Sequence, residues 1–152
     1  MKNLTTIFRA VLFFFVAVLT ACGPSQEELK ISALDHFNRG NTHFKQQRML
    51  EAAEEYKKAI ALDSEQERFY YNLGLVYYSL VLYEKAIGEY WKAIEHNPKF
   101  PEAWYNLALA FEKVDKTEDA FMAYEKYQSL SKEAKEEQKE KEKPKVLLKP
   151  GS

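Results

Sequence analysis

Cysteine is almost missing from this chain, because Cys22 is the only one among 152 residues. A disulfide framework and a metal site built from cysteines are therefore excluded. The local signatures of catalysis are missing too. The sequence has no glycine-rich phosphate loop, no His-Glu-x-x-His run and no signature of a Ser/His/Asp arrangement. We therefore expect no enzyme activity and no cofactor.

Histidine, which titrates close to neutral pH, occurs only three times. His36 and His43 are two helical turns apart in sequence, which places them on one helical face but about 10 Å apart. That distance is too long for them to share a metal without a third element. We expect both to pack as substitutes for aromatic side chains, and we expect no metal site.

The chain also lacks a surplus of either charge, with 22 basic and 23 acidic residues and a formal net charge of -1. A protein that binds duplex nucleic acid normally concentrates positive charge on one face. No part of this sequence does so, and nucleic acid is not an expected partner.

A long apolar run is present near the N-terminus, at Ala10–Leu19, after the basic residues Lys2 and Arg9. The run is too short for a helix that crosses a bilayer of about 30 Å. Its length and its basic start predict that residues 1–21 form a signal peptide.

The signal ends in Leu19-Thr20-Ala21-Cys22, which resembles the bacterial lipobox. The resemblance implies that Cys22 receives a lipid and becomes the first residue of the mature protein. Residues 22–32 would then form the lipidated cysteine, a short tether and the start of the first helix. Two or three fatty chains hold firmly, since each buried methylene adds about 0.8 kcal/mol.

Gly23 follows the cysteine, where an aspartate would be the familiar signal for retention in the inner membrane. The resemblance therefore implies a lipid-anchored protein of the cell envelope, on the periplasmic side of the outer membrane of a Gram-negative bacterium. In a bacterium with a single membrane, the same lipid would hold the protein on the outer face of that membrane.

The rest of the chain is dominated by one repeated unit, which occurs three times, at 33–66, 67–100 and 101–134. The middle unit carries the pattern at Tyr70, Leu73, Gly74, Tyr77, Ala86, Tyr90 and Pro98. The third unit carries Trp104, Leu107, Ala108, Phe111, Ala120 and Tyr124, and the first carries His36, Arg39, Gly40, His43, Ala52, Tyr56 and Ala59. The pattern resembles the tetratricopeptide repeat family over Ala33–Ala134.

This resemblance implies an all-α fold of three stacked helix-turn-helix units, an α-solenoid. A single helix pair cannot bury its apolar face alone, so stacking makes the core continuous. Small residues allow the two helices of a unit to cross closely. We expect Gly40, Gly74 and Ala108 to face Ala52, Ala86 and Ala120.

Two short flanks surround the repeats. Ser25 and Glu28 have the spacing of a capping box, which predicts that the first helix begins at Gln26. Residues 135–152 alternate lysine and glutamate up to Pro144, which predicts a charged helical extension followed by a disordered tail. Within that tail, Val146–Leu148 is a candidate docking element.

The resemblance also implies that ligands bind on the concave face formed by the first helix of each unit. The expected peptide-binding groove consists of Phe37, Asn38, Asn41, Phe44, Tyr71, Asn72, Leu75, Tyr78, Tyr105, Asn106 and Leu109. Three of its asparagines, Asn38, Asn72 and Asn106, recur one repeat apart. An amide can donate to and accept from the peptide groups of a bound chain, and the rings beside it supply apolar anchors. Asparagine at this position can equally serve the fold.

The groove departs from the carboxylate-clamp subgroup of the family, which needs lysine and arginine at the positions of Phe37, Glu102 and Asn106. Recognition of an acidic C-terminus is therefore not expected. Instead, we expect a peptide or a helix of a partner protein to lie in the groove.

Two functions follow from these features. The first is a membrane-anchored adaptor that holds a segment of an envelope machine, such as pilus-secretin, outer-membrane protein or cell-wall machinery. The alternative is a structural envelope protein that binds no peptide and self-associates as a homo-oligomer, through Trp91 or through the open ends of its repeats. Single exposed apolar residues such as Trp91 are common, which favours the first.

Overall fold

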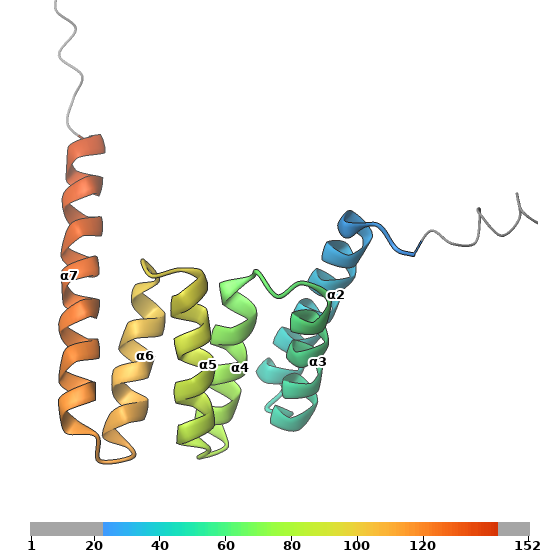
Figure 1. The fold of residues 1–152 in the computed structure, drawn as a ribbon, viewed down its shortest axis with the longest axis horizontal. Helices are drawn as coiled ribbons and strands as arrows, with labels where there is room; N and C mark the ends of the chain where they lie inside the picture. The colour runs from blue at the N-terminus through green and yellow to red at the C-terminus, as the bar shows by residue number, and fades with distance from the viewer. Residues whose placement is uncertain (1–22, 143–152) are drawn as a thin grey trace, which may run out of the picture.

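The computed structural model describes residues 23–142, so the predicted signal peptide, Cys22 and residues 143–152 of the predicted tail lie outside this part. The described part is all-helical (Figure 1). Its helices are α2 (Gln26–Lys45), α3 (Met49–Leu62), α4 (Glu67–Ser79), α5 (Tyr83–His96), α6 (Pro101–Glu112) and α7 (Thr117–Glu142). Helix α2 begins with the capping box, in which Ser25 and Glu28 bond reciprocally. Pro101 occupies the first position of α6, where its missing N–H costs nothing.

The helices pack as three pairs, α2 with α3, α4 with α5 and α6 with α7, and the pairs pack in sequence through α3–α4 and α5–α6. The result is a row with α2 at one end and α7 at the other (Figure 1). Buried residues form three clusters, and the side chain of Ile60 packs against all of them. The core is therefore built between pairs as much as within them.

The turn inside each pair has one residue with a left-handed backbone. These residues are Gln47, Val81 and Asp115, with φ of 60°, 63° and 59°, and they occupy the same position in the three repeats. A β-branched residue such as Val81 rarely adopts this conformation. The same hydrogen bond closes every turn, from the N–H of Arg48, Leu82 and Lys116 to the C=O of His43, Tyr77 and Phe111.

The links between pairs also repeat. The hydroxyl of Tyr70 donates a hydrogen bond to the carbonyl of Ser64 at 3.1 Å, and the indole N–H of Trp104 donates one to the carbonyl of Pro98 at 3.0 Å. The acceptor is a backbone oxygen, so Ser64 can replace proline at this position. The linker thus stays fixed although its sequence departs from the repeat pattern.

The glycines of the helix crossings face tyrosine rings, a contact that the expected pairing of small residues did not include. A Cβ on Gly40 would lie 2.5 Å from Cε1 of Tyr56, and one on Gly74 would lie 2.5 Å from Cε1 of Tyr90. Both tyrosines are fully buried. Glycine is required here because the ring of the second helix lies flat against the first.

The third pair differs because Ala108 stands at the glycine position. The equivalent ring, Tyr124, is 42 % exposed, whereas Tyr56 and Tyr90 have no exposed surface. An alanine methyl occupies the space that the ring takes in the other pairs. Tyr124 instead lies against Tyr105 and Tyr127, with ring centroids 6.2 and 5.7 Å away.

The two ends of the row differ in character. At the positions where α4 buries Phe69, Leu73 and Val76, α2 has the exposed Asp35, Arg39 and Thr42. Asp35 and Arg39 form an ion pair of 2.6 Å. The N-terminal end is therefore polar, which explains why the first unit departs from the apolar pattern.

The C-terminal end is formed by α7, which continues through Lys132, the position held by Pro98 in the second unit, and runs on to Glu142. Leu130 is its last buried residue, and residues 132–142 are exposed. No proline ends the helix here, so its last turns project beyond the stack (Figure 1).

The ring contact predicts opposite effects for two glycine substitutions. Gly74→Ala should lower the free energy of unfolding by about 1–3 kcal/mol, because its methyl collides with Tyr90. Gly88→Ala, in a helix with no atom within 4 Å of the added Cβ, should raise it by about 0.5–1 kcal/mol. Urea unfolding followed by circular dichroism measures both, and equal effects would contradict the ring contact.

Candidate functional site

The predicted groove residues all lie on the first helices of the three pairs, α2, α4 and α6. We call this set of residues, from Phe37 to Leu109, the groove face. Helices α4 and α6 also contact each other directly, which places them on the inner side of the stack. Every groove-face residue is half-buried or exposed, and none is fully buried. The side chains are therefore available at a surface formed by all three repeats.

Four of the five rings of the groove face, all except Tyr105, also pack against the core. Phe37 packs against Tyr56 and Phe69, with centroid distances of 5.7 and 5.0 Å. Tyr71 packs against Tyr90 and Phe100, at 6.0 and 4.9 Å. These rings support the fold as well as the surface, so they are less free than the sequence suggested.

The most accessible ring of the groove face lies on the third repeat. Tyr105 is 37 % exposed and packs against Tyr127 at 5.1 Å. Tyr124 completes this cluster of three tyrosines. Sequence reasoning missed Tyr124 and Tyr127 as surface residues, although Tyr127 stands where the earlier repeats have Ala59 and Ala93.

The asparagines of the groove face are partly occupied by their own helices. The amide of Asn72 donates to the carbonyl of Arg68 at 2.9 Å, and the amide of Asn106 donates to the carbonyl of Glu102 at 3.0 Å. The amide of Asn106 also donates to the hydroxyl of Tyr71 at 3.0 Å. Within residues 23–142, the amide oxygens of Asn72 and Asn106 accept no hydrogen bond. They can serve as acceptors for N–H groups of a ligand.

The asparagine of the first repeat differs from these two. The side chain of Asn38 makes no hydrogen bond to the described residues, while its backbone carbonyl accepts from Thr42. Both the donor and the acceptor of this amide are therefore open to a ligand.

Beneath the groove face, two buried tyrosine hydroxyls have different partners. Tyr56 donates to the amide oxygen of Asn41 at 2.8 Å. Leu75 stands at the position equivalent to Asn41, and the Tyr90 hydroxyl has no partner within the described residues. Burial raises the pKa of Tyr56 to about 12, and burial with nearby Tyr71 and Tyr78 raises the pKa of Tyr90. Both hydroxyls therefore stay protonated at neutral pH.

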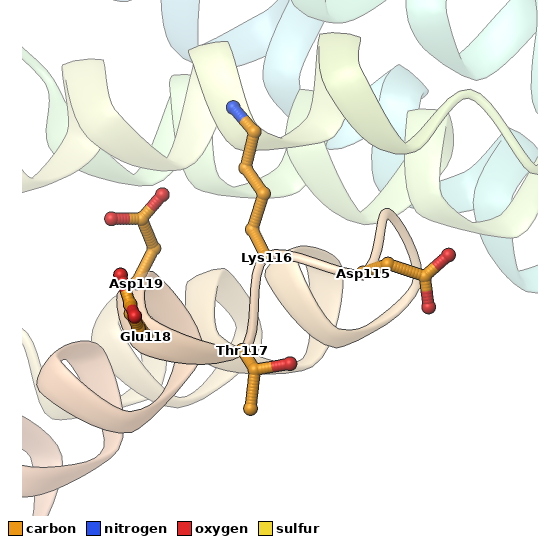
Figure 2. A pocket seen from close by; sticks show the side chains of 5 residues that line it. All are labelled: Asp115, Lys116, Thr117, Glu118 and Asp119. Carbon is orange, nitrogen blue, oxygen red and sulfur yellow. The ribbon is translucent and has the colours of Figure 1, made fainter.

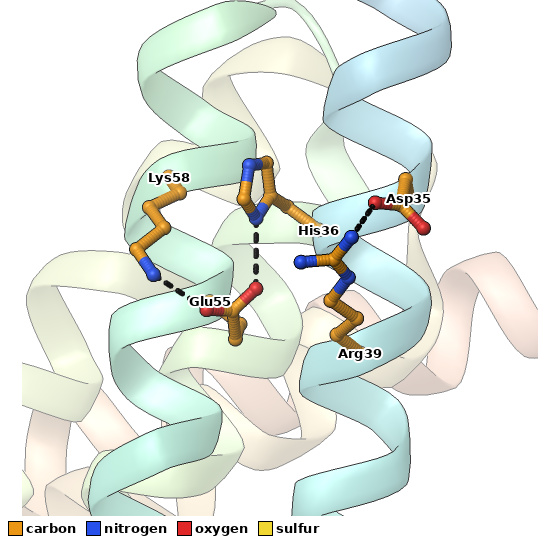
Figure 3. A network of polar contacts seen from close by, with 5 residues as sticks. All are labelled: Asp35, His36, Arg39, Glu55 and Lys58. Carbon is orange, nitrogen blue, oxygen red and sulfur yellow. Dashed lines mark hydrogen bonds and ion pairs between the residues drawn. The ribbon is translucent and has the colours of Figure 1, made fainter.

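The histidines of the first repeat are half-buried. His36 Nδ1 lies 2.7 Å from a carboxylate oxygen of Glu55, and Lys58 lies 2.6 Å from the other oxygen (Figure 3). These hydrogen bonds, first from His36 and then from Lys58, lower the pKa of Glu55 to about 2. His36 thus links α2 to α3 by a polar contact, whereas the sequence predicted a packing role. Residues 23–142 contain no group of three histidine, cysteine, aspartate or glutamate side chains placed to hold a metal.

Comparison with sequence families identifies the repeat. A family model described as "TPR repeat" matches residues 40–81 and 83–115, and one described as "Tetratricopeptide repeat" matches residues 101–139. The chain belongs to the tetratricopeptide repeat family. No curated protein matches the sequence.

Solved tetratricopeptide repeat structures share the arrangement of the helices. The second TPR domain of Spaghetti (RPAP3), bound to the HSP90 peptide SRMEEVD, is 25 % identical with a TM-score of 0.67, over 69 % of this chain and 96 % of that one. The first TPR domain of the same protein, bound to the same peptide, is 26 % identical with a TM-score of 0.65, over 66 % and 80 %. The crystal structure of MamA is 28 % identical with a TM-score of 0.68, over 73 % and 69 %. Within residues 23–142, no helix of this tetratricopeptide repeat protein is long and apolar enough to cross a membrane.

The unequal tyrosine partners give a stability prediction. Asn41→Leu should lower the free energy of unfolding by about 1–3 kcal/mol, because it leaves the Tyr56 hydroxyl buried without an acceptor. Leu75→Asn should cost about 1 kcal/mol less than Leu109→Asn, since only the first supplies an acceptor to a buried hydroxyl. Thermal or urea unfolding of the three variants provides the test. Equal costs for the two leucine substitutions would contradict it.

Proposed function

We propose that this protein is an adaptor whose groove face binds an extended or helical segment of a partner protein. The observation that carries the proposal is a set of partly exposed rings and amides on the first helices of three stacked repeats. Rings provide apolar contact at low entropy cost, and amide oxygens of Asn72 and Asn106 accept from peptide N–H groups. No cofactor is required for this role.

The bound partner should differ from the peptide of the structural relatives. SRMEEVD, which the two Spaghetti domains bind, carries three acidic residues. The positions at which a carboxylate clamp needs lysine and arginine hold Phe37, Glu102 and Asn106 in this chain, and Glu102 lies on the same helix face as Asn106. A neutral or apolar segment matches this surface better than an acidic one does.

The proposal places the adaptor at a membrane through a lipid on Cys22. Its support is the lipobox-like Leu19-Thr20-Ala21-Cys22 sequence after an apolar run. Helix α2 begins at Gln26, so only a few residues would separate the lipid from the fold. The groove face would then lie close to a bilayer of the cell envelope. In this proposal the protein assists the assembly of an envelope complex on the periplasmic side of the outer membrane.

End-to-end stacking is a less suitable function. It would require the polar N-terminal end, with its Asp35–Arg39 ion pair, to cover the exposed Phe121 at the other end. Burial of a charged pair against an aromatic ring has a desolvation cost that such a contact does not offset. The repeats are therefore better suited to binding a partner than to forming a filament.

Substitutions in the groove face should remove partner binding without unfolding the protein. We chose Tyr78→Ser with Tyr105→Ser, because neither ring is fully buried. A Phe121→Ser variant, which changes a ring 63 % exposed and outside the groove face, is the control. The double variant should lose at least about tenfold in partner recovery, measured by cross-linking in its own membrane and mass spectrometry. Unchanged recovery would refute the groove as the binding surface.

A second experiment tests the anchor. Cys22→Ser removes the sulfur that would carry the lipid, so the variant should incorporate no labelled palmitate and should leave the membrane fraction or keep its signal. Growth with labelled palmitate followed by fractionation measures both properties. A processed variant that remains bound to the membrane would disprove lipid anchoring and leave the groove proposal intact.

A further inference from the structure

The outer face of the molecule has an apolar pocket that the groove face does not use. It lies between α5, α6 and α7, has a volume of about 270 Å³, and is lined mainly by Trp91, Trp104, Phe111, Met122 and Ala123. The two indoles meet edge to face at 5.5 Å. Trp91 is 40 % exposed and Met122 is 59 % exposed, so the pocket is open to large side chains from outside.

The equivalent place one repeat earlier is occupied by charged side chains. There, Lys57 stands in place of Trp91 and Glu89 in place of Ala123. Glu89 forms an ion pair of 3.0 Å with Lys92, which fills the space with polar groups. Met122 also stands where the preceding repeat has Gly88. The apolar pocket therefore results from three exchanges specific to the last repeats, and stacking of the repeats does not require it.

Unpaired acidic side chains lie one helical turn from residues that line the pocket. Glu95 lies one helical turn after Trp91, and Glu118 and Glu125 lie one turn to either side of Met122. Within residues 23–142, none of these three carboxylates forms an ion pair. Asp119 and Lys126 contribute one acidic and one basic group to the pocket itself.

The turn before α7 extends this acidic rim. Figure 2 shows Asp115, Glu118 and Asp119 on the turn and first helical turn that border a second hollow, of about 330 Å³. Lys116 lies among them, with its ammonium 5.8 Å from the ring centre of Phe111. Acidic groups outnumber basic ones here, and the surroundings therefore suit a segment that combines aliphatic side chains with positive charge.

We propose that this pocket binds residues Lys145–Lys149 of a second copy of the chain. The segment reads Lys-Val-Leu-Leu-Lys, with three aliphatic residues between two lysines. Its apolar part matches the indoles and Met122, and its lysines match the carboxylates of the rim. The inference does not depend on the ligand of the groove face.

Chain length excludes the same contact within one molecule. Met122 and Glu142 belong to one continuous helix, and its rise per residue separates them by about 30 Å. The stretch from Glu142 to Leu148 reaches at most about 20 Å when extended. Two copies whose α7 helices run antiparallel would bring each tail to the other's pocket, which is a closed two-fold arrangement.

Intrinsic fluorescence tests the proposal directly, because Trp91 and Trp104 are the only tryptophans in the chain and both line the pocket. The probe is a synthetic peptide of residues 143–152, which contains no tryptophan or tyrosine. It is added to a chain that begins at Gly23 and carries Ser in place of Val146, Leu147 and Leu148, so that its own tail does not compete. A saturable change in tryptophan emission, weaker at higher salt, is expected.

Matched variants separate the pocket from other surfaces. Ala123→Glu introduces the glutamate found one repeat earlier, and Lys126 stands at the position of that glutamate's partner lysine. Trp91→Lys changes an exposed side chain with little risk to folding. Each should weaken peptide binding at least about tenfold, as should a peptide with Leu147 and Leu148 replaced by Ser. The groove variant Tyr78→Ser/Tyr105→Ser should bind the peptide normally.

Sedimentation of the chain from Gly23 to Ser152 gives the second readout. The proposal expects a dimer that dissociates when Val146, Leu147 and Leu148 are replaced by Ser. An emission spectrum that does not respond to the peptide, or binding that the pocket variants leave unchanged, would overturn the proposal. So would an oligomeric state that the three serines do not alter.

Discussion

The structure depends on the contact between a buried tyrosine ring and a glycine where the two helices of a repeat cross. Gly40 with Tyr56 and Gly74 with Tyr90 have the same geometry, with the ring 2.5 Å from the position of an added Cβ. This contact sets the distance between the helices of a pair. Because each ring lies against the first helix of its own pair, it also supports the groove face from beneath.

The third repeat shows what happens when the constraint is relaxed. Ala108 excludes the ring, and Tyr124 becomes a surface residue. Tyr127 replaces the fully buried Ala59 and Ala93 of the earlier repeats. A ring at this position would obstruct another helix pair, so the exchange that ends the stack also enlarges the accessible aromatic surface over α6 and α7.

Much of this architecture could be predicted from sequence. The regular period of the repeat and the positions of Gly40, Gly74 and Pro98 predicted three helix pairs, and the structure and the family comparisons confirm them. The spacing of Ser25 and Glu28 correctly placed the start of α2. These features are local, because each depends on residues within one helix or one repeat.

Contacts between helices were harder to predict. The sequence assigned alanines to the glycine contact, since small residues at equal spacing do not reveal which side chain fills the gap. It treated Phe37 and Tyr71 as free groove residues, although their rings also pack in the core. It could not show that the Asn106 amide is shared with Tyr71, because that bond depends on the angle between neighbouring pairs.

The outer pocket was likewise only partly visible. Trp91 stood out as an apolar residue on an outward face, but its partner Trp104 comes from another helix. The substitution of Ala123 for the glutamate of the preceding repeat is informative only once the two places are known to be equivalent in space. The proposed pocket therefore depends on departures from a regular repeat.

A double-mutant cycle between Gly74 and Tyr90 tests the central contact most directly. The free energy of unfolding is measured for the wild type, Gly74→Ala, Tyr90→Leu and the double variant. If the ring sets the helix distance, the alanine should cost much less once the ring is removed, with a coupling of about 1 kcal/mol or more. Additive effects of the two substitutions would contradict the account.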